Sequence, residues 1–221
     1  MSLTVKICGL STSEALDVAL DAGADMVGFV FFPPSPRNIS FKAAAALESR
    51  VRGMAKKVAL TVDADDTLLA YVVDALGPDI LQLHGNESPL RVSAIKARFK
   101  LPVMKAIAVE SKADLAAIAR YAAVADNLLF DARAPREATR PGGLGKSFDW
   151  RLLENLHPGA PFMLSGGLNA GNVGEALRIT RAAGVDVSSG VESAPGKKDP
   201  DKIRAFVSAA RLAVKPIASP A

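Results

Sequence analysis

The stretch Thr4-Val5-Lys6-Ile7-Cys8-Gly9 has the composition of a short buried β-strand that ends at a turn. Val5 and Ile7 are β-branched, and Gly9 closes the apolar run. Cys8, the single cysteine among 221 residues, stands at the end of this strand and has no partner for an internal disulfide. Buried cysteine commonly acts as a small apolar side chain, so Cys8 is either part of the core or a reactive group at a strand tip.

Further apolar runs follow the first at the spacing of one strand and one helix. The ends of the first two runs, Cys8 and Phe31, are about 23 residues apart, as are the ends of the last two, Ser165 and Ser188. Several runs are apolar at nearly every position, which is typical of parallel strands covered on both faces. The expected strands are residues 4–8, 26–31, 58–62, 80–83, 103–107, 127–131, 162–165 and 185–188.

The segments between these runs carry the apolar spacing of helices, and Gly23, Gly77 and Gly184 stand where three helices should end. The pattern predicts an α/β protein: a single closed (β/α)8 TIM barrel of parallel strands over residues 1–214, with a frayed tail over 215–221. A flavodoxin-like or Rossmann sheet is the alternative, but no G-x-G-x-x-G follows the first strand. The expected helices are residues 13–22, 67–76, 88–98, 112–122, 170–183 and 200–214.

The composition narrows the class of protein. Hydrophobic residues make up 49 % of the chain, enough for one large core. The net charge of +4 comes from scattered basic residues, and Lys56-Lys57 and Lys197-Lys198 are interpreted as solvated surface, so no nucleic-acid partner is expected. One cysteine and two histidines predict no metal site. Without a signal peptide or a long apolar segment, the chain is expected to be cytoplasmic, with no membrane contact.

A barrel also predicts where the chemistry takes place, because the carboxyl ends of its strands and the loops after them converge on one mouth. Glycine-rich loops follow the seventh and eighth strands, and their backbone amides predict a phosphate site, although each loop alone could be an ordinary turn. The residues of these two loops are Gly166 and Gly167, and Ser188, Ser189 and Gly190. The other residues expected at the mouth are Cys8, Arg37, His84 and Asp131.

The polar groups at the mouth allow more than one interpretation. Asp131 ends an apolar strand and is either a loop or N-cap aspartate or a general acid whose pKa is raised by desolvation. Arg37 follows a proline-rich loop and is either solvated or a fork for a substrate carboxylate or phosphate. His84 is a structural histidine or a neutral polar contact, and the loop 140–146 is a lid or a flexible connection. Asp186, inside the eighth strand, must meet a cation, amides or a ligand.

Several short motifs, taken in order, resemble those of the phosphoribosylanthranilate isomerase family of tryptophan biosynthesis. The resemblance extends over almost the whole chain, and it rests on the ordered set rather than on any single motif. The motifs are Lys6-Ile7-Cys8-Gly9, Ser35-Pro36-Arg37, Gln82-Leu83-His84-Gly85, Asp131, Phe148-Asp149-Trp150, Ser165-Gly166-Gly167-Leu168 and Asp186-Val187-Ser188-Ser189-Gly190-Val191-Glu192.

The resemblance implies a (β/α)8 barrel that converts N-(5-phosphoribosyl)anthranilate into 1-(2-carboxyphenylamino)-1-deoxyribulose 5-phosphate by an Amadori rearrangement, with no cofactor and no metal. It implies that Cys8 is the general base, as a thiolate favoured by nearby positive charge such as that of Arg37, and that Asp131 is the general acid. The groups expected to bind the substrate are Arg37, His84 and Asp186, and those expected to bind its phosphate are Gly166, Gly167, Ser188, Ser189 and Gly190.

Two positions depart from the family pattern. Leu144 replaces the hydroxyl residue of a Gly-Gly-Thr-Gly loop, and Asn86 stands where an acidic residue is common. Leu144 therefore leaves no side-chain hydrogen bond from that point of the loop.

Other functions remain as alternatives. An indoleglycerol phosphate synthase would need a lysine acid with paired glutamates, which Lys105 alone does not supply, and a ribulose-phosphate epimerase would need metal-binding histidines. A barrel that senses a phosphorylated metabolite would keep the phosphate loops without an acid and a base. The chain is expected to act on a small phosphorylated molecule as a monomer or a homodimer.

Overall fold

The structure is a computed structural model that describes residues 3–135 and 137–214, so the frayed tail expected at 215–221 lies outside the described residues. Eight parallel strands close into a barrel in chain order, and β1 pairs with both β2 and β8. This closure confirms the predicted barrel and excludes an open sheet. The strands are β1 (Thr4–Cys8), β2 (Met26–Phe31), β3 (Lys56–Thr61), β4 (Ile80–Leu83), β5 (Val103–Val109), β6 (Asn127–Ala132), β7 (Phe162–Leu164) and β8 (Gly184–Val187).

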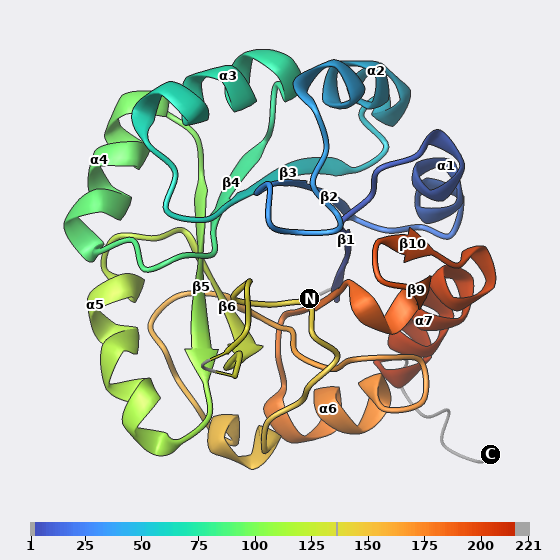
Figure 1. Ribbon diagram of the computed structural model, residues 1–221. Helices are drawn as coiled ribbons and strands as arrows, with labels where there is room; N and C mark the ends of the chain where they lie inside the picture. The colour runs from blue at the N-terminus through green and yellow to red at the C-terminus, as the bar shows by residue number, and fades with distance from the viewer. Residues whose placement is uncertain (1–2, 136, 215–221) are drawn as a thin grey trace.

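Helices surround the strands as a ring (Figure 1). Two short 3₁₀ segments contribute to this ring, η1 (Lys112–Ala117) directly before α5 and η2 (Trp150–Leu153) between β6 and β7. The crossing from β6 to β7 therefore has a 3₁₀ turn in place of an α-helix. The α-helices are α1 (Ser13–Asp21), α2 (Phe41–Val51), α3 (Asp66–Leu76), α4 (Pro89–Phe99), α5 (Ile118–Ala122), α6 (Val173–Thr180) and α7 (Pro200–Ala213).

Three helical segments differ from the sequence prediction. The helix expected at 112–122 is the 3₁₀ segment η1 over its first half and an α-helix only over α5. Helix α2 was not expected, yet Ser40 caps it by accepting a hydrogen bond from the Ala43 amide at 3.2 Å. Helix α6 ends at Thr180 rather than at residue 183, because the next residue, Arg181, takes a left-handed conformation. Gly184 therefore does not end this helix. It begins β8, where a Cβ would lie 2.9 Å from the Thr4 carbonyl oxygen of β1.

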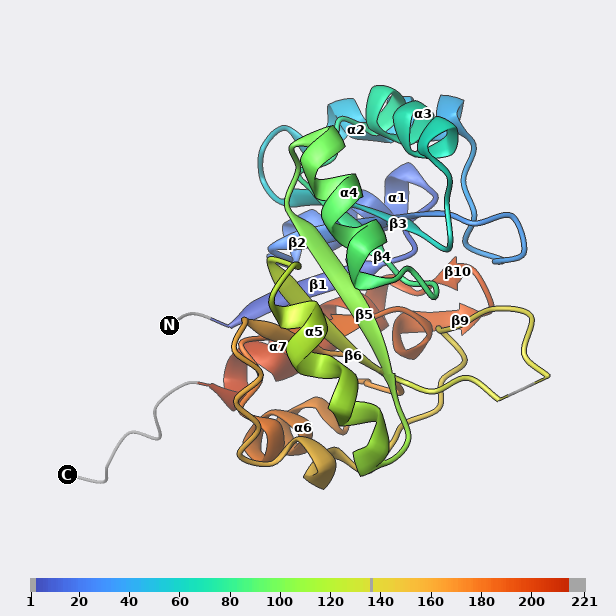
Figure 2. The ribbon, with the colours of Figure 1, turned by 90° about the vertical axis from the view of Figure 1, so that its left-hand side faces the viewer.

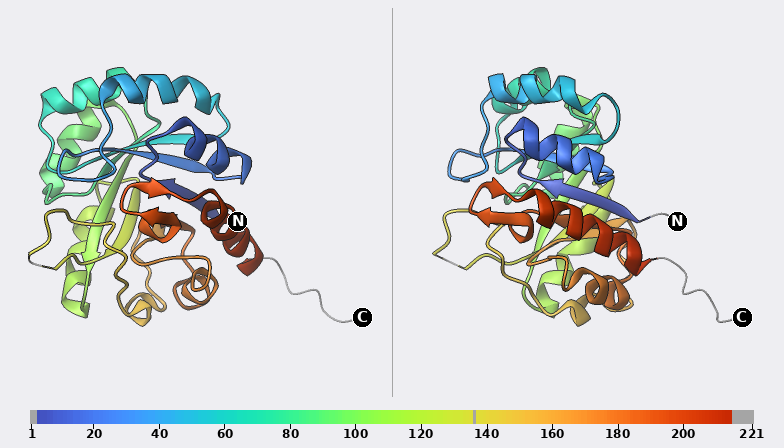
Figure 3. Two further views of the ribbon diagram at one scale, coloured as in Figure 1. Left: turned by 45° about the vertical axis from the view of Figure 1, so that its right-hand side comes forward. Right: turned by 90° about the vertical axis from the view of Figure 1, so that its right-hand side faces the viewer.

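A small hairpin follows the barrel at the carboxyl ends of the strands. It consists of β9 (Glu192–Ala194) and β10 (Lys197–Lys198), which come after the 3₁₀ turn η3 (Ser189–Val191) and were not predicted. The hairpin and the long loop after β6 extend from the same side of the barrel in Figure 2, and Figure 3 shows them from the other direction. Both elements therefore belong to the mouth.

The alternation of side chains along the strands decides what the mouth contains. On β1, Val5 and Ile7 pack outward against the helices, while Cys8 joins an inward apolar group with Val30 and Leu60. Below that group, apolar side chains from β3 to β7 fill the barrel. Among residues 3–135 and 137–214, no helix has both the length and the apolar character needed to cross a membrane.

Candidate active site

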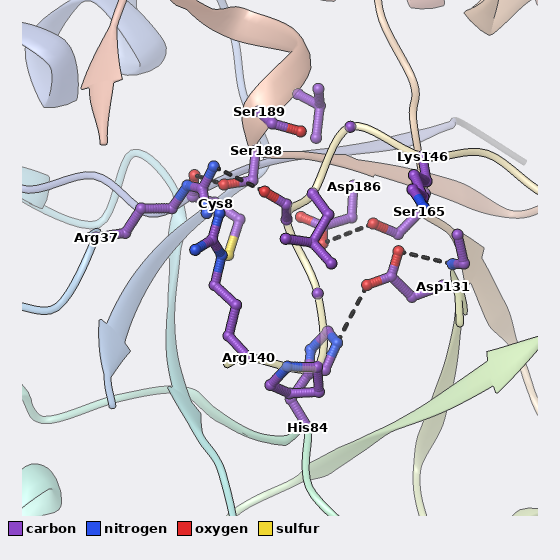
Figure 4. A pocket seen from close by; sticks show the side chains of 18 of the residues that line it. Cys8, Arg37, His84, Asp131, Arg140, Lys146, Ser165, Asp186, Ser188 and Ser189 are labelled. Atoms are coloured by element: carbon purple, nitrogen blue, oxygen red, sulfur yellow. Dashed lines mark hydrogen bonds and ion pairs between the residues drawn. The ribbon is translucent and has the colours of Figure 1, made fainter. Parts of the chain in front are cut away.

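One pocket at the mouth gathers every residue that was predicted to act there. The pocket spans about 780 Å³ including its open side, and it is lined by residues from the ends of β1, β2, β3, β6 and β8 and from the loops after β2, β3, β4, β6, β7 and β8. Cys8 and Asp131 lie on opposite sides of it in Figure 4, with Asp186 between them. The predicted residues that line the pocket are Cys8, Arg37, His84, Asp131, Asp186, Gly166, Gly167, Ser188, Ser189 and Gly190.

Asp131 belongs to β6 itself and is therefore not an N-cap. Its carboxyl group is buried and has two hydrogen-bond partners. Oδ2 lies 3.2 Å from His84 Nε2, and Oδ1 accepts a hydrogen bond from the Ala132 amide at 2.9 Å. On the other side of the imidazole, Gln82 Nε2 lies 3.1 Å from His84 Nδ1. When Gln82 donates this bond, the neutral imidazole carries its proton on Nε2 and donates to Asp131.

The Cys8 thiol lines the pocket, yet only 3 % of its residue surface is exposed. Burial raises the pKa of the Cys8 thiol, the positive charges of Lys6 and Lys198 act in the opposite direction, and the charge of Asp186 adds to the rise. The positive charge that was expected from Arg37 is therefore supplied by two lysines instead.

The cation that Asp186 requires is Lys6. Lys6 Nζ donates to Asp186 Oδ1 at 2.9 Å, and both side chains are buried. Burial opposes the charge of Lys6, but Asp186 and Cys8 outweigh it and raise the lysine pKa. The second oxygen of Asp186 lies 3.5 Å from Ser165 Oγ.

Arg37 is buried, so its solvated interpretation is wrong. Its Nε and one terminal nitrogen donate to the two carboxylate oxygens of Glu192 at 2.7 and 2.8 Å, and the same terminal nitrogen donates to the Gly143 carbonyl at 3.1 Å. Burial opposes ionisation of Glu192, but the hydrogen bond from Arg37 and the charge of Lys198 hold its pKa below the ordinary value. Two of the three guanidinium nitrogens are thus committed to the protein.

Lys198 corrects the expectation that the Lys197-Lys198 pair is solvated. The side chain of Lys198 is 2 % exposed, and its ammonium donates to Glu192 Oε1 at 2.8 Å and to the Ser188 carbonyl at 2.9 Å. Burial lowers the pKa of Lys198, and the charge of Glu192 offsets this only in part. Lys198 therefore attaches the β9–β10 hairpin to the loop after β8.

The two glycine-rich loops pack against each other and against the 140–146 loop. A Cβ at Gly190 would collide with the Leu168 carbonyl, and one at Gly167 would lie 2.8 Å from the backbone of Lys146. Ser188 Oγ also donates to the Cys8 carbonyl at 3.1 Å, which joins the loop after β8 to the end of β1. These close contacts explain why the loops require glycine where the sequence has it.

Arg140 is a site residue that the sequence analysis missed. It lines the pocket together with the rest of the loop up to Lys146, and Figure 4 shows its side chain reaching into the pocket. Its buried Nε has no hydrogen-bond partner within the described part of the chain. An arginine directly before the Pro-Gly-Gly sequence was the available signal.

Lys105 does not serve the alternative chemistry of a lysine acid. Its ammonium is buried and donates to Glu87 Oε2 at 3.0 Å and to the carbonyls of Leu83, Gly85 and Ala106. The lysine holds the loop after β4, which carries His84, and it does not line the pocket at the mouth.

Comparison with known proteins agrees with this geometry. The profile of the family described as N-(5'phosphoribosyl)anthranilate (PRA) isomerase matches residues 5–209. An N-(5'-phosphoribosyl)anthranilate isomerase from Nitrobacter winogradskyi is 68 % identical over 213 residues, which is 96 % of this chain and 95 % of the relative. One from Bradyrhizobium diazoefficiens is 67 % identical, with 96 % and 95 % covered.

Solved structures lead to the same family. The phosphoribosyl anthranilate isomerase of Thermotoga maritima superimposes with a TM-score of 0.86 at 35 % identity, covering 95 % of this chain and 99 % of that one. An isomerase structure in complex with reduced 1-(o-carboxyphenylamino)-1-deoxyribulose 5-phosphate gives a TM-score of 0.82 at 32 % identity, with 95 % and 99 % covered. The chain belongs to the N-(5'-phosphoribosyl)anthranilate isomerase family.

Proposed function

We propose that this chain catalyses the Amadori rearrangement of N-(5-phosphoribosyl)anthranilate in tryptophan biosynthesis, with Cys8 as general base and Asp131 as general acid. The observation that carries the proposal is that Cys8 and Asp131 line one pocket beside the glycine-rich loops after β7 and β8. The activity of the named relatives and the reduced 1-(o-carboxyphenylamino)-1-deoxyribulose 5-phosphate bound in one structural neighbour support the same substrate.

In the first step Asp131 donates a proton to the ring oxygen of the ribose. The ring C–O bond breaks while the lone pair of the anilino nitrogen forms an iminium, so the positive charge resides on the substrate. The hydrogen bond from His84 and that from the Ala132 amide orient the Asp131 carboxyl toward one position in the pocket.

In the second step the Cys8 thiolate removes the proton from C2. The electron pair of the C2–H bond forms the enolamine and neutralises the iminium nitrogen, after which tautomerisation gives the ketone. The substrate's own nitrogen is the electron sink, so the residues of the pocket need only move protons.

Binding uses the two anionic groups of the substrate. Backbone amides of Gly166, Gly167 and the 188–190 loop are proposed to hold the phosphate. Arg37 and Arg140 are proposed to face the anthranilate carboxylate, Arg37 through the terminal nitrogen that Glu192 does not occupy. His84 and Asp186 are proposed as the remaining substrate contacts.

The chain is proposed to act in the cytoplasm as a monomer or a homodimer. The Thermotoga maritima isomerase is dimeric, and the structure of monomers generated from it has also been solved, so both states are accessible to that relative. Size-exclusion chromatography with light scattering decides between the two for this chain.

The catalytic roles are tested with Cys8→Ser and Asp131→Asn. Each variant should lower kcat by about 10² to 10⁴, since that is the range that a general acid or base contributes. Loss of the anthranilate fluorescence of the substrate follows the reaction, and circular dichroism checks folding. Near-wild-type kcat in a folded variant would show that the assigned role is wrong. Binding without turnover by the wild-type chain would indicate a metabolite sensor.

A further inference from the structure

Lys6 occupies an unusual position, because it is a fully buried ammonium group inside the barrel next to the proposed base. Lys6 and Cys8 are two residues apart on β1 and therefore share its inward face. Lys6 is the register partner of Asp186 where β1 closes against β8, and its Nζ lies 2.9 Å from Asp186 Oδ1. Neither the sequence motifs nor the proposed proton transfers assign a task to this lysine.

Gly28 on the neighbouring strand β2 leaves space for the lysine and the thiol together. A Cβ at Gly28 would lie 3.0 Å from Cys8 Sγ and 3.1 Å from Lys6 Nζ. Contacts this short are tighter than a methyl group tolerates, so any larger residue would displace the sulfur, the ammonium or both. The space beside the Gly28 Cα thus borders both the Cys8 sulfur and the Lys6 ammonium, and it stays unfilled because glycine has no side chain.

We infer that Lys6, held by Asp186 and given room by Gly28, is a positioning residue that keeps the Cys8 thiol ready to act as a thiolate. This inference rests on the proposed role of Cys8 as the base. Burial among apolar neighbours raises the free energy of a thiolate relative to the thiol. A cation in contact with the sulfur lowers that free energy again. Lys6 meets this need because its ion pair with Asp186 keeps the buried ammonium protonated.

The other charged groups around Cys8 do not replace Lys6. From β10, Lys198 contributes positive charge, but its ammonium is bonded to Glu192 and to the backbone of Ser188. From the loop after β2, the Arg37 guanidinium is occupied by Glu192. Among the other charged or titratable groups of the pocket, His84 is hydrogen-bonded to Asp131, and Arg140, Arg133 and Lys146 come from the segment after β6.

The proton balance of the base step fits this arrangement. The C2–H bond of the substrate breaks, the S–H bond of Cys8 forms, and the released electron pair moves into the enolamine. Lys6 keeps its proton throughout and stays paired with Asp186. The lysine therefore lowers the free energy of forming the thiolate without exchanging a proton with the substrate.

The test uses the fact that the chain contains one cysteine, so its thiolate can be titrated in the absence of substrate. Thiolate ultraviolet absorbance is recorded against pH, with Cys8→Ser as the blank. Lys6→Met should raise the pKa of Cys8 by about 1 to 3 units, the size expected for loss of an adjacent opposite charge. It should also lower kcat near neutral pH tenfold or more, with partial recovery at higher pH.

Two further variants cover the case in which Lys6→Met does not fold. The double variant Lys6→Met with Asp186→Asn removes the buried pair together. It should raise the pKa of Cys8 by less than the single change, because the opposing charge of Asp186 is lost as well. Gly28→Ala keeps every charged group and should also raise the pKa, by displacing the ammonium from the sulfur.

The matched control is Lys105→Met with Glu87→Gln, which removes another buried lysine–carboxylate pair, one that does not line the pocket. This control should leave the titration of Cys8 unchanged. An unchanged titration in folded Lys6 variants would overturn the role of Lys6. If Cys8→Ser keeps full turnover while the titration still responds to Lys6, then Cys8 is not the base but Lys6 still controls the thiol.

Discussion

His84 Nε2 lies 3.2 Å from Asp131 Oδ2, and this contact joins the end of β4 to β6 across the intervening strand β5. The histidine is itself contacted by Gln82, which is completely buried in β4. A chain of three side chains thus fixes the direction of the Asp131 carboxyl. The proposed acid is therefore oriented before the substrate arrives.

His84→Asn should lower kcat about fivefold, because loss of one hydrogen bond of roughly 1 kcal/mol frees the Asp131 carboxyl to rotate. Steady-state fluorescence kinetics measures the change. The control is His157→Asn, since His157 is exposed and does not line the pocket. Equal kcat for wild type and both variants would contradict the orienting role of His84.

Arg140→Met should raise KM by about ten- to a hundredfold and leave kcat within a few-fold, since a charged hydrogen bond to the substrate contributes about 1.5–3 kcal/mol. The comparison variant is Arg178→Met on the exposed face of α6, which should leave both constants unchanged. A fall in kcat without a change in KM would place Arg140 in the chemical step rather than in binding.

Gly190→Ala should weaken phosphate binding, because the new Cβ would collide with the Leu168 carbonyl and push the two glycine-rich loops apart. Inorganic phosphate as a competitive inhibitor gives a direct readout, and its inhibition constant should rise at least tenfold. Gly174→Ala in α6 is the matched glycine control, because a Cβ there would lie 3.8 Å from the Ala213 Cβ, an ordinary van der Waals contact, and the helix gains about 1 kcal/mol from alanine. Equal inhibition constants for the two variants would remove the 188–190 loop from the phosphate site.

Glu192→Gln should destabilise the fold by about 3 kcal/mol at neutral pH, because Arg37 and Lys198 then lose their buried counter-charge. The folded-state pKa of Glu192 is depressed, so its contribution is fully present above its ordinary pKa of 4.5 and is lost as pH falls through the folded value. The stability difference from wild type should therefore shrink below pH 4.5. Urea unfolding at several pH values measures it, and a difference independent of pH would contradict the assignment.

The strands could be predicted from the sequence because each apolar run is bounded by turn residues, and Thr4–Cys8, Met26–Phe31 and Ile80–Leu83 match the prediction at both ends. Helix α2 was missed because four successive alanines at 43–46 weaken its apolar periodicity, although Ala44, Leu47 and Val51 are its buried residues. Its capping serine and high helix propensity were nevertheless visible. The β9–β10 hairpin was missed because a strand of two residues has no periodicity.

The site could be predicted as a set of positions, since the carboxyl ends of barrel strands are known once the strands are known. The charge pairing within it could not be predicted. Lys6 interrupts an apolar strand just as Asp186 does, but only the register between β1 and β8 places them opposite each other. Arg37 and Lys198 looked like surface residues because their partner Glu192 lies in the unpredicted hairpin.

The bond between Lys6 and Asp186 joins residues separated by 180 positions, nearly the full length of the barrel. During synthesis β1 is made long before β8. The Lys6 ammonium therefore stays in contact with water until β8 has left the ribosome and brings Asp186 beside it. Activity is therefore expected only after the barrel closes, and it should not increase gradually with chain length. Turnover measured in a translation mixture would thus be proportional to the number of completed barrels.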